Sequence, residues 1–265
     1  MTNWDFVALL AIFIFGVPHG GFDAAIARRN GWSMGGSLSW VLFHLAYILI
    51  AAIVAILWWW FPLTSLSLFL LISGYHFGAS DLADVDSHWL PWLAHGGLVS
   101  IAIPNFHVAE VLPIFSLLAG AHEAEQLMQL LSNLFFAWVA CCIGYCIFTF
   151  LHRDYLKPLM NLLILIVIAW LLPPLIGFAL YFCFWHSRGH ILRLWRSLQK
   201  NQRYDAMREA IIYTIASWIC AVLFFFYLHG SISDIMLQLT FIGLAALTWP
   251  HMVLVDYMDK RRMPL

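Results

Sequence analysis

Long apolar stretches follow one another along the chain from Phe6 to Val255, and short polar segments separate them. A helix needs about 20 mainly apolar residues to cross the hydrocarbon core of a bilayer. On that measure we expect about nine membrane-spanning helices, at residues 4–20, 37–60, 63–82, 89–104, 127–150, 157–172, 174–195, 208–229 and 234–257. The pattern predicts an all-α, polytopic bundle embedded in a membrane.

The composition supports a membrane protein. Hydrophobic residues make up 63% of the chain and charged residues 10%, whereas soluble domains carry roughly 25% charged residues. No polar block is long enough for a second domain, so we expect residues 1–265 to form a single membrane-embedded catalytic domain. The first apolar stretch has no basic region before it, so we expect it to remain in the protein.

The basic residues give an orientation, provided that the ambiguous segment 105–126 does not cross the membrane. All the basic loops then lie on one side, including Arg28 and Arg29, Arg153 and Lys157, the group from Arg193 to Arg208, and Lys260, Arg261 and Arg262. By the positive-inside rule that side is the cytoplasm. We therefore expect a multi-pass protein of the cell inner membrane, with the N-terminus outside and the C-terminus in the cytoplasm.

Four histidine motifs interrupt the apolar helices, each with small residues or carboxylates beside the imidazole. They are Gly-Val-Pro-His-Gly-Gly-Phe-Asp at 16–23, Tyr-His-Phe-Gly-Ala-Ser-Asp at 75–81, Trp-His-Ser-Arg-Gly-His at 185–190 and Pro-His-Met-Val-Leu-Val-Asp at 250–256. Polar side chains inside a membrane are costly and tend to mark functional sites. In the nine-span arrangement all five histidines lie at one depth, near the cytoplasmic side.

The histidines at this depth predict a metal site. His186 and His190 are four residues apart, which places both imidazoles on one helix face. His19 and His76, from other spans, bring the set to four nitrogen donors without a thiolate, which suits Fe, Zn, Cu or Ni. The sequence does not choose among these ions.

Carboxylates follow three of the histidines at close to one helical turn. Asp23 follows His19, Asp81 follows His76, and Asp256 follows His251. A carboxylate in such a position can accept the second ring N–H of a ligand histidine and fix its orientation. We expect these three residues to orient ligands without binding the metal.

The remaining histidines and the cysteines have simpler interpretations. We expect His44, His95 and His229 to be packing residues held by interhelical hydrogen bonds. Histidines in predicted loops or at span ends are expected to be solvated, namely His88, His107, His122 and His152. The five cysteines lie within apolar segments without paired metal spacing, so we expect them to pack between helices.

Aromatic residues surround the histidine motifs. Aromatic residues also form belts at membrane interfaces, which is how we interpret Trp58-Trp59-Trp60. Beside a metal they would instead line an apolar tunnel. The expected tunnel residues are Phe22, Tyr75, Phe77, Phe182, Trp185 and Trp249.

The four motifs, in this order, resemble those of the Brp/Blh family of membrane β-carotene 15,15′-dioxygenases over nearly the whole chain. The resemblance implies cleavage of the central double bond of β-carotene by O₂ to give two all-trans-retinal, with Fe²⁺ as cofactor. It implies iron ligands at His19, His76, His186 and His190, and a position for His251 behind the ligands or near the substrate. No catalytic side chain beyond the metal site is expected. The bilayer, β-carotene and O₂ are the implied partners, together with a retinal-binding rhodopsin that receives the product.

Three other functions stay open on the sequence alone. A di-iron membrane hydroxylase or desaturase would need more clustered histidines than the five that share a depth. A metal or proton transporter would need polar residues through the full membrane thickness. A retinal-binding opsin assembly factor would use the same aromatic surroundings without catalysis. The net charge of −1 argues against nucleic acid as a partner.

Overall fold

A computed structural model describes residues 2–32, 36–85 and 88–259, and these are helical apart from short connections. The all-α class is confirmed. The residues group into two compact units, a terminal unit made of Met1–Trp60 and Cys183–Leu265 and a central unit made of Phe61–Phe182. The expectation of one catalytic domain over residues 1–265 stays a prediction, and each unit is described by itself.

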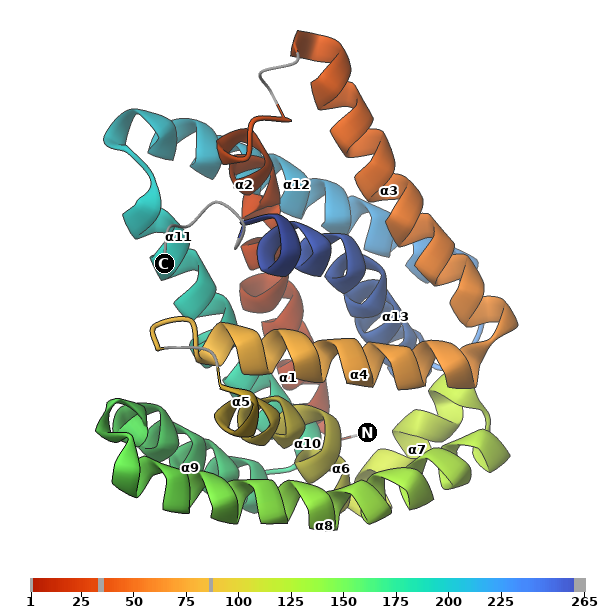
Figure 1. Cartoon of the computed structure of the whole chain (residues 1–265). Helices are drawn as coiled ribbons and strands as arrows, with labels where there is room; N and C mark the ends of the chain where they lie inside the picture. The colour runs from red at the N-terminus through yellow and green to blue at the C-terminus, as the bar shows by residue number, and fades with distance from the viewer. Residues whose placement is uncertain (1, 33–35, 86–87, 260–265) are drawn as a thin grey trace. The chain divides into compact units, whose positions relative to one another are not determined.

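The terminal unit contains the first and the last helices of the chain. They are α1 (Asn3–Ala11), η1 (Ile12–Gly16), η2 (Val17–Phe22), α2 (Asp23–Arg29), α3 (Gly36–Trp60), α11 (Arg188–Ser197), α12 (Lys200–Tyr227), α13 (Ile232–Met252) and η7 (Val253–Asp259). Helix α12 packs on η2 and α2, while α13 packs on α3 (Figure 1). The N-terminal and C-terminal segments of the chain are thus combined in one unit.

Small residues allow close helix packing in this unit. A Cβ atom on Gly21 would lie 2.6 Å from the Ala210 carbonyl oxygen, so η2 and α12 are in backbone contact at this glycine. Ala206 and Ala210 of α12 are buried, as are Ala25 and Ile26 of α2. In a membrane, where lipid is as apolar as leucine, such close packing is a main source of helix association.

The central unit contains the intervening helices. They are α4 (Pro62–Asp81), α5 (Trp89–Gly97), η4 (Leu98–Ala102), α6 (Ile103–Phe106), α7 (Val108–Ala119), α8 (Ala121–Leu151), η5 (Arg153–Tyr155), α9 (Leu156–Leu171) and α10 (Pro174–Leu180). Helix α5 packs against α4 and α8 (Figure 1). The indole of Trp138 in α8 donates a hydrogen bond of 2.9 Å to the Ala94 carbonyl oxygen of α5.

Seven of the described helical segments are long and apolar enough to cross a membrane. They are Asn3–Arg29, Gly36–Trp60, Pro62–Asp81, Ala121–Leu151, Arg153–Leu171, Lys200–Tyr227 and Ile232–Asp256. The chain is therefore a multi-pass membrane protein.

The structure supports fewer spans than the nine expected from the sequence. The expected span at 89–104 lies in the helical segment Trp89–Phe106, which continues into Val108–Ala119 through a bend of 107°. These two segments make an eighth span only if they are taken together as one. The expected span at 174–195 is not among these seven, and its second half carries Arg188 and Arg193. The predicted side of each terminus stays a prediction, and the basic residues Lys260, Arg261 and Arg262 lie outside the described residues.

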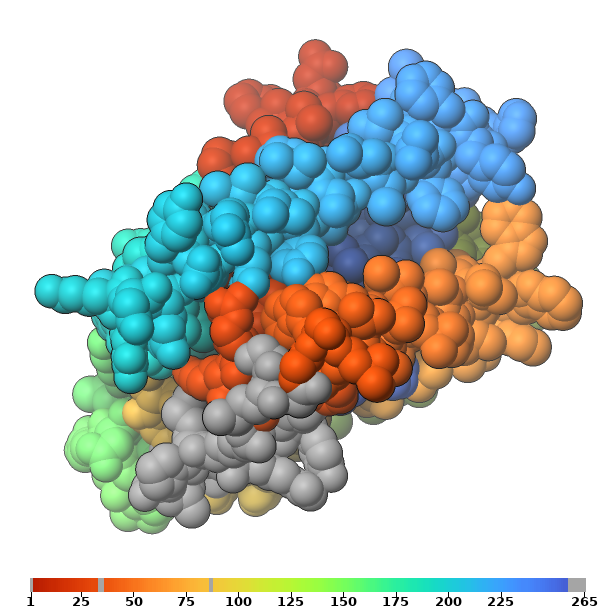
Figure 2. Space-filling model, turned by 90° about the horizontal axis from the view of Figure 1, so that it is seen from above, coloured from red at the N-terminus to blue at the C-terminus, as the bar shows by residue number. Residues whose placement is uncertain are grey.

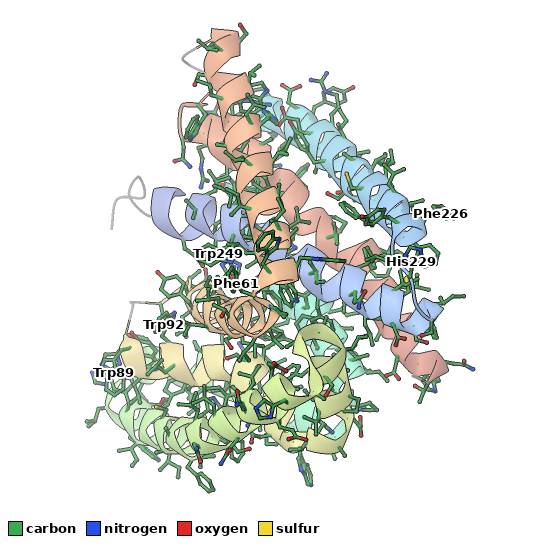
Figure 3. The ribbon with its side chains drawn as sticks, turned by 90° about the vertical axis from the view of Figure 1, so that its right-hand side faces the viewer. Phe61, Trp89, Trp92, Phe226, His229 and Trp249 are labelled. Atoms are coloured by element: carbon green, nitrogen blue, oxygen red, sulfur yellow. The ribbon has the colours of Figure 1, made fainter. Side chains whose placement is uncertain are left out.

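Apolar side chains cover the outside of several helices. On α12, which crosses the face shown in Figure 2, Ile215, Ile219 and Leu223 are exposed. Phe226 at the end of this helix is 80% exposed and projects outward in Figure 3. Such surfaces are stable in lipid and would aggregate in water. His229, expected to be a packing residue, also lies exposed after α12 (Figure 3), so that prediction is wrong.

Candidate metal centre

Irregular helical turns carry three of the four histidine motifs. His19 lies in the 3-10 helix η2, directly after the π-helix η1. His186 lies in the π-helix η6 (Tyr181–Ser187), and His251 precedes the π-helix η7. π-Helical turns are rare and occur frequently at functional sites. The motifs thus coincide with local departures from regular α-helix.

Four imidazoles meet in the terminal unit. The His19 ring centre lies 5.5 Å from that of His186, 5.8 Å from that of His190 and 4.9 Å from that of His251. The rings of His190 and His251 are 5.2 Å apart. All four side chains belong to residues that are at most 8% exposed. The structure therefore brings His19, His186 and His190 together, as expected for ligands, and adds His251 to the same cluster.

Hydrogen bonds to Nδ1 orient two of these rings. His19 Nδ1 lies 2.5 Å from the Gly16 carbonyl oxygen, and the buried hydroxyl of Ser187 is 3.3 Å from the same nitrogen. A carbonyl can only accept, so we assign the proton to Nδ1. His251 Nδ1 is bound to Asp23 Oδ1 at 2.7 Å. In both rings Nε2 is thus the nitrogen that could bind a metal. Histidines that bind a metal through one nitrogen commonly donate a hydrogen bond from the other.

The cluster fits a metal ion in donor chemistry and nearly in spacing. Two imidazoles that bind one ion through nitrogens about 2.1 Å away have ring centres roughly 4.6 to 5.3 Å apart when the angle between the two bonds is about 90° to 110°. Two of the four ring separations lie in that interval, and the other two exceed it slightly. Among the described residues, no three His, Cys, Asp or Glu side chains are already arranged to hold an ion. The rings of His186 and His190 would have to turn or approach to complete a site.

Asp23 is the carboxylate at the centre of this arrangement. Its residue is 3% exposed, and its Oδ2 accepts a 2.7 Å hydrogen bond from the hydroxyl of Tyr47 in α3 while Oδ1 is bound to His251. The sequence placed Asp23 near a ligand, and the structure identifies the imidazole it holds as that of His251. Asp256 is 8% exposed in η7, and its expected orienting role stays a prediction.

His76 and Asp81 belong to the central unit. His76 is 2% exposed, and its proposed role as a ligand stays a prediction from the sequence. Asp81 Oδ2 accepts a 3.1 Å hydrogen bond from the Tyr181 hydroxyl and lies 3.4 Å from His95 Nδ1. Each unit therefore contains a carboxylate held between a tyrosine hydroxyl and a histidine Nδ1.

The expected tunnel residues are divided between the two units. Phe22 is buried in the core of the terminal unit, where Trp185 and Trp249 are half-buried. Trp249 is labelled in Figure 3. In the central unit Phe77 packs edge-on against Tyr181 at 5.2 Å, and Phe182 stacks on Phe178 at 5.5 Å. Tyr75 is 42% exposed and packs on Trp92. A shared tunnel for these six residues stays a prediction.

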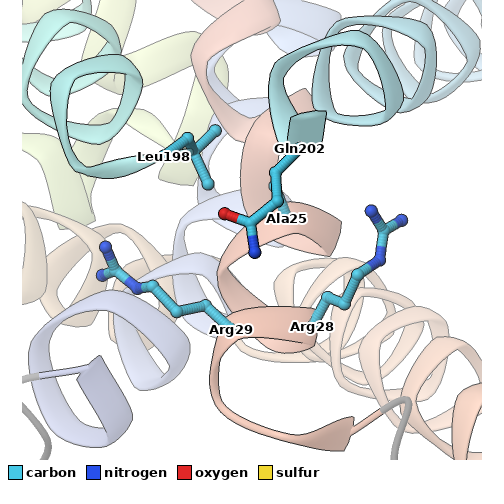
Figure 4. A pocket seen from close by; sticks show the side chains of 5 residues that line it. All are labelled: Ala25, Arg28, Arg29, Leu198 and Gln202. Atoms are coloured by element: carbon cyan, nitrogen blue, oxygen red, sulfur yellow. The ribbon is translucent and has the colours of Figure 1, made fainter. Parts of the chain in front are cut away.

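A small cavity in the terminal unit is lined by none of the expected tunnel residues. It has a volume of about 40 Å³ and is lined by Ala25, Arg28, Arg29, Leu198 and Gln202 (Figure 4). A cavity that holds a drug-sized ligand has roughly 300 Å³ or more. This one is too small for a long polyene.

Several polar residues of these networks were not identified from the sequence. Tyr47 lies in an apolar segment far from the histidine motifs. Tyr181 lies five residues before His186 and Ser187 lies within the 185–190 motif, but no role was predicted for either. His95 was expected to be a packing residue held by an interhelical hydrogen bond, and this prediction is confirmed, because His95 is 1% exposed and its Nδ1 lies 3.4 Å from Asp81 Oδ2 of α4. His44 does behave as expected, because Nε2 is 2.5 Å from the Tyr213 hydroxyl. His107, expected to be solvated, instead lies 2.8 Å from the Ala169 carbonyl oxygen.

The chain is similar to known proteins over nearly its whole length. A family model described as β-carotene 15,15′-dioxygenase matches residues 10–259. A curated β-carotene 15,15′-dioxygenase from the uncultured marine bacterium 66A03 is 38% identical over 263 residues, which cover 97% of this chain and 94% of the relative. No solved structure matches the chain. The match of the family model, together with this identity, shows that the chain belongs to the β-carotene 15,15′-dioxygenase family.

Proposed function

We propose that this protein is an iron-dependent dioxygenase that cleaves β-carotene at the central 15,15′ double bond. One O₂ supplies the oxygen atoms of both aldehydes, so the products are two molecules of all-trans-retinal. The observation that carries the proposal is the convergence of four buried imidazoles in a member of this family. Imidazole donors without a thiolate suit iron as well as other divalent ions.

The proposed ligands are His19, His76, His186 and His190. Bound Fe²⁺ would supply the activation of O₂, which no side chain can perform alone. The protein holds the ring orientation through Nδ1 of His19, which the Gly16 carbonyl oxygen and the Ser187 hydroxyl approach. Asp23, Asp81 and Asp256 act behind the ligands, where such partners raise metal affinity and fix the tautomer.

The surroundings of the cluster support an apolar substrate. The four histidine residues are nearly fully buried, and the helices around them present apolar side chains outward. β-Carotene has no polar group, so it partitions into the bilayer, whose hydrocarbon core is about 30 Å thick. A multi-pass enzyme can take this substrate from lipid and return retinal to it. We propose that a microbial rhodopsin in the same membrane receives the retinal.

The function can be tested in cells and with purified protein. Expression in a bacterium that makes β-carotene should bleach the cells and yield retinal, measured by chromatography of extracts. Purified enzyme should form two retinal for each β-carotene consumed. His190→Ala should lose turnover, whereas His229→Ala, which changes an exposed histidine, should retain it. Products shorter or longer than retinal, or full turnover in His190→Ala, would contradict the proposal.

A further inference from the structure

His251 lies closer to the cluster than a residue behind the ligands would need to be. Its ring centre is 4.9 Å from that of His19 and 5.2 Å from that of His190. Both separations fall within the roughly 4.6 to 5.3 Å expected for two imidazoles on one ion. The corresponding separations of His19 from His186 and His190 are 5.5 and 5.8 Å. By ring spacing, His251 is the best-placed partner of His19.

A carboxylate holds Nδ1 of His251. Nδ1 is bound to Asp23 Oδ1 at 2.7 Å, and Asp23 Oδ2 accepts the Tyr47 hydroxyl at the same distance. The carboxylate therefore uses one oxygen for each partner. A carboxylate bound to the outer nitrogen of a metal-bound histidine is a common arrangement that fixes the ring and increases its basicity.

Three separate elements contribute to this chain of hydrogen bonds. Tyr47 belongs to α3, Asp23 begins α2, and His251 lies at the end of α13. His251 follows Pro250 and precedes the π-helix η7, so the backbone around it departs from regular α-helix on its C-terminal side. Because α13 packs on α3 and η7 on α2, the orientation of the His251 ring is fixed by the packing of the unit.

We propose that His251 binds the metal directly through Nε2, and that Asp23 and Tyr47 are positioning residues that hold its ring. The inference rests on the proposed metal centre and changes its ligand set. The proposed ligands of the terminal unit would then be His19, His186, His190 and His251, beside His76 of the central unit. Tyr47 gains a role that its place in an apolar helix did not indicate.

The experiment measures metal binding by purified protein in detergent, by titration against a competing chelator. Loss of a residue behind a ligand typically lowers affinity by about 10- to 100-fold. We therefore expect Asp23→Asn to fall in that range, Tyr47→Phe to lose less, and His251→Gln, which keeps a side chain of similar length, to lose more than about 100-fold. Tyr213→Phe is the matched control, because its hydroxyl is bound to His44 in the same unit. It should bind metal like the wild type.

A spectrum separates a ligand from a positioning residue. Co²⁺ bound in place of the native metal has visible absorption bands that depend on the number and type of its ligands. When saturated, Asp23→Asn and Tyr47→Phe should show the wild-type bands, whereas His251→Gln should show shifted bands. Wild-type affinity and wild-type bands in His251→Gln would overturn this inference and leave the proposed centre intact. Failure of the wild type itself to bind metal would overturn the centre and the inference with it.

Discussion

Gly96 of α5 lies so close to Gly74 of α4 that a Cβ atom on Gly96 would come within 2.1 Å of the Gly74 carbonyl oxygen. The two helices are in backbone contact at this point, two residues before His76 and one residue after His95 along the chain. The glycines are therefore needed for the position of both histidines within the central unit.

Gly96→Ala should destabilise the protein, because the added methyl group must push α4 and α5 apart. Overpacking of a well-packed interior typically costs about 1 to 3 kcal/mol. The measurement is the free energy of unfolding of purified protein in detergent. Gly243→Ala in α13 is the control, since its Cβ would meet no atom within 4 Å. A Gly96→Ala variant as stable as the Gly243→Ala variant would show that the helices can separate at little cost.

Asp81 and His95 should stabilise the central unit as a pair. Their side chains are 4% and 1% exposed, so removal of either leaves a buried polar partner. In a double-mutant cycle of Asp81→Ala and His95→Ala, we expect a coupling energy of about 0.5 to 3 kcal/mol in the free energy of unfolding. Asp81→Ala combined with Asn105→Ala should instead be additive, because Asn105 is bound to the carbonyl oxygens of Ile101 and Leu131. Additivity in both cycles would contradict the pairing of Asp81 with His95.

Removal of the metal should abolish turnover reversibly. A strong chelator should release the ion, and Fe²⁺ should restore retinal formation while Zn²⁺, which has no redox chemistry, should not. Elemental analysis of the active protein should give one iron per chain. Two irons per chain would favour the di-iron hydroxylase or desaturase considered from the sequence. Restoration by Zn²⁺ would exclude an oxygen-activating role for iron.

Changes of the expected tunnel residues should alter product or substrate choice without altering metal content. Phe77 and Phe182 are the most informative positions to change, because both side chains are buried and their rings pack against each other. Phe77→Leu or Phe182→Leu should shift the cleaved bond or the accepted carotenoids, as measured by chromatography of the products. Trp59→Leu changes a side chain that is 76% exposed and should leave the products unchanged. If all six positions tolerate substitution at wild-type rates, the polyene is held elsewhere.

The chain should cross the membrane an odd number of times, which puts its two termini on opposite sides. We expect reporter fusions to place the N-terminus outside and the C-terminus in the cytoplasm, with Arg28 and Arg29 on the cytoplasmic side. The seven helices that qualify singly agree with termini on opposite sides, whereas an eighth span from the bent pair alone would place both on one side. Reporters active on the same side of the membrane would therefore exclude the nine-span arrangement.

Periodicity and hydropathy were enough to predict the long spans. The boundaries expected at 37–60 and 63–82 differ little from Gly36–Trp60 and Pro62–Asp81, because each is a long apolar stretch with a proline or glycine at its start. The bend between α6 and α7 was not predictable in this way. The helix ends at Phe106, the last residue of the short α6, and α7 begins after His107. Hydropathy alone does not indicate such an interruption.

The sequence grouped three of the four histidines that meet in the terminal unit as ligands, and it placed the fourth, His251, behind them or near the substrate. The nine-span arrangement puts all five motif histidines at one depth, because depth can be counted from helix length. That shared depth stays a prediction. The role of Asp23 could not be predicted in this way. Asp23 accepts a hydrogen bond from the Tyr47 hydroxyl and is bound to His251, a residue 228 positions away. Contacts of that kind follow from the rotation of each helix about its axis, which the sequence pattern leaves open.

The π-helical turns decide that rotation. Each contains more residues per turn than an α-helix, and one extra residue rotates everything after it by about 100° about the helix axis. Deletion of a single residue from η6, such as the exposed Phe184, would let this stretch return to α-helix and would swing His190 relative to the residues before the turn. Chain length within η1, which precedes His19, and within η6, which precedes His190, is therefore under as strict a requirement as the histidines themselves. A relative that keeps every histidine but lacks one residue in such a turn would carry the ligands on the wrong faces.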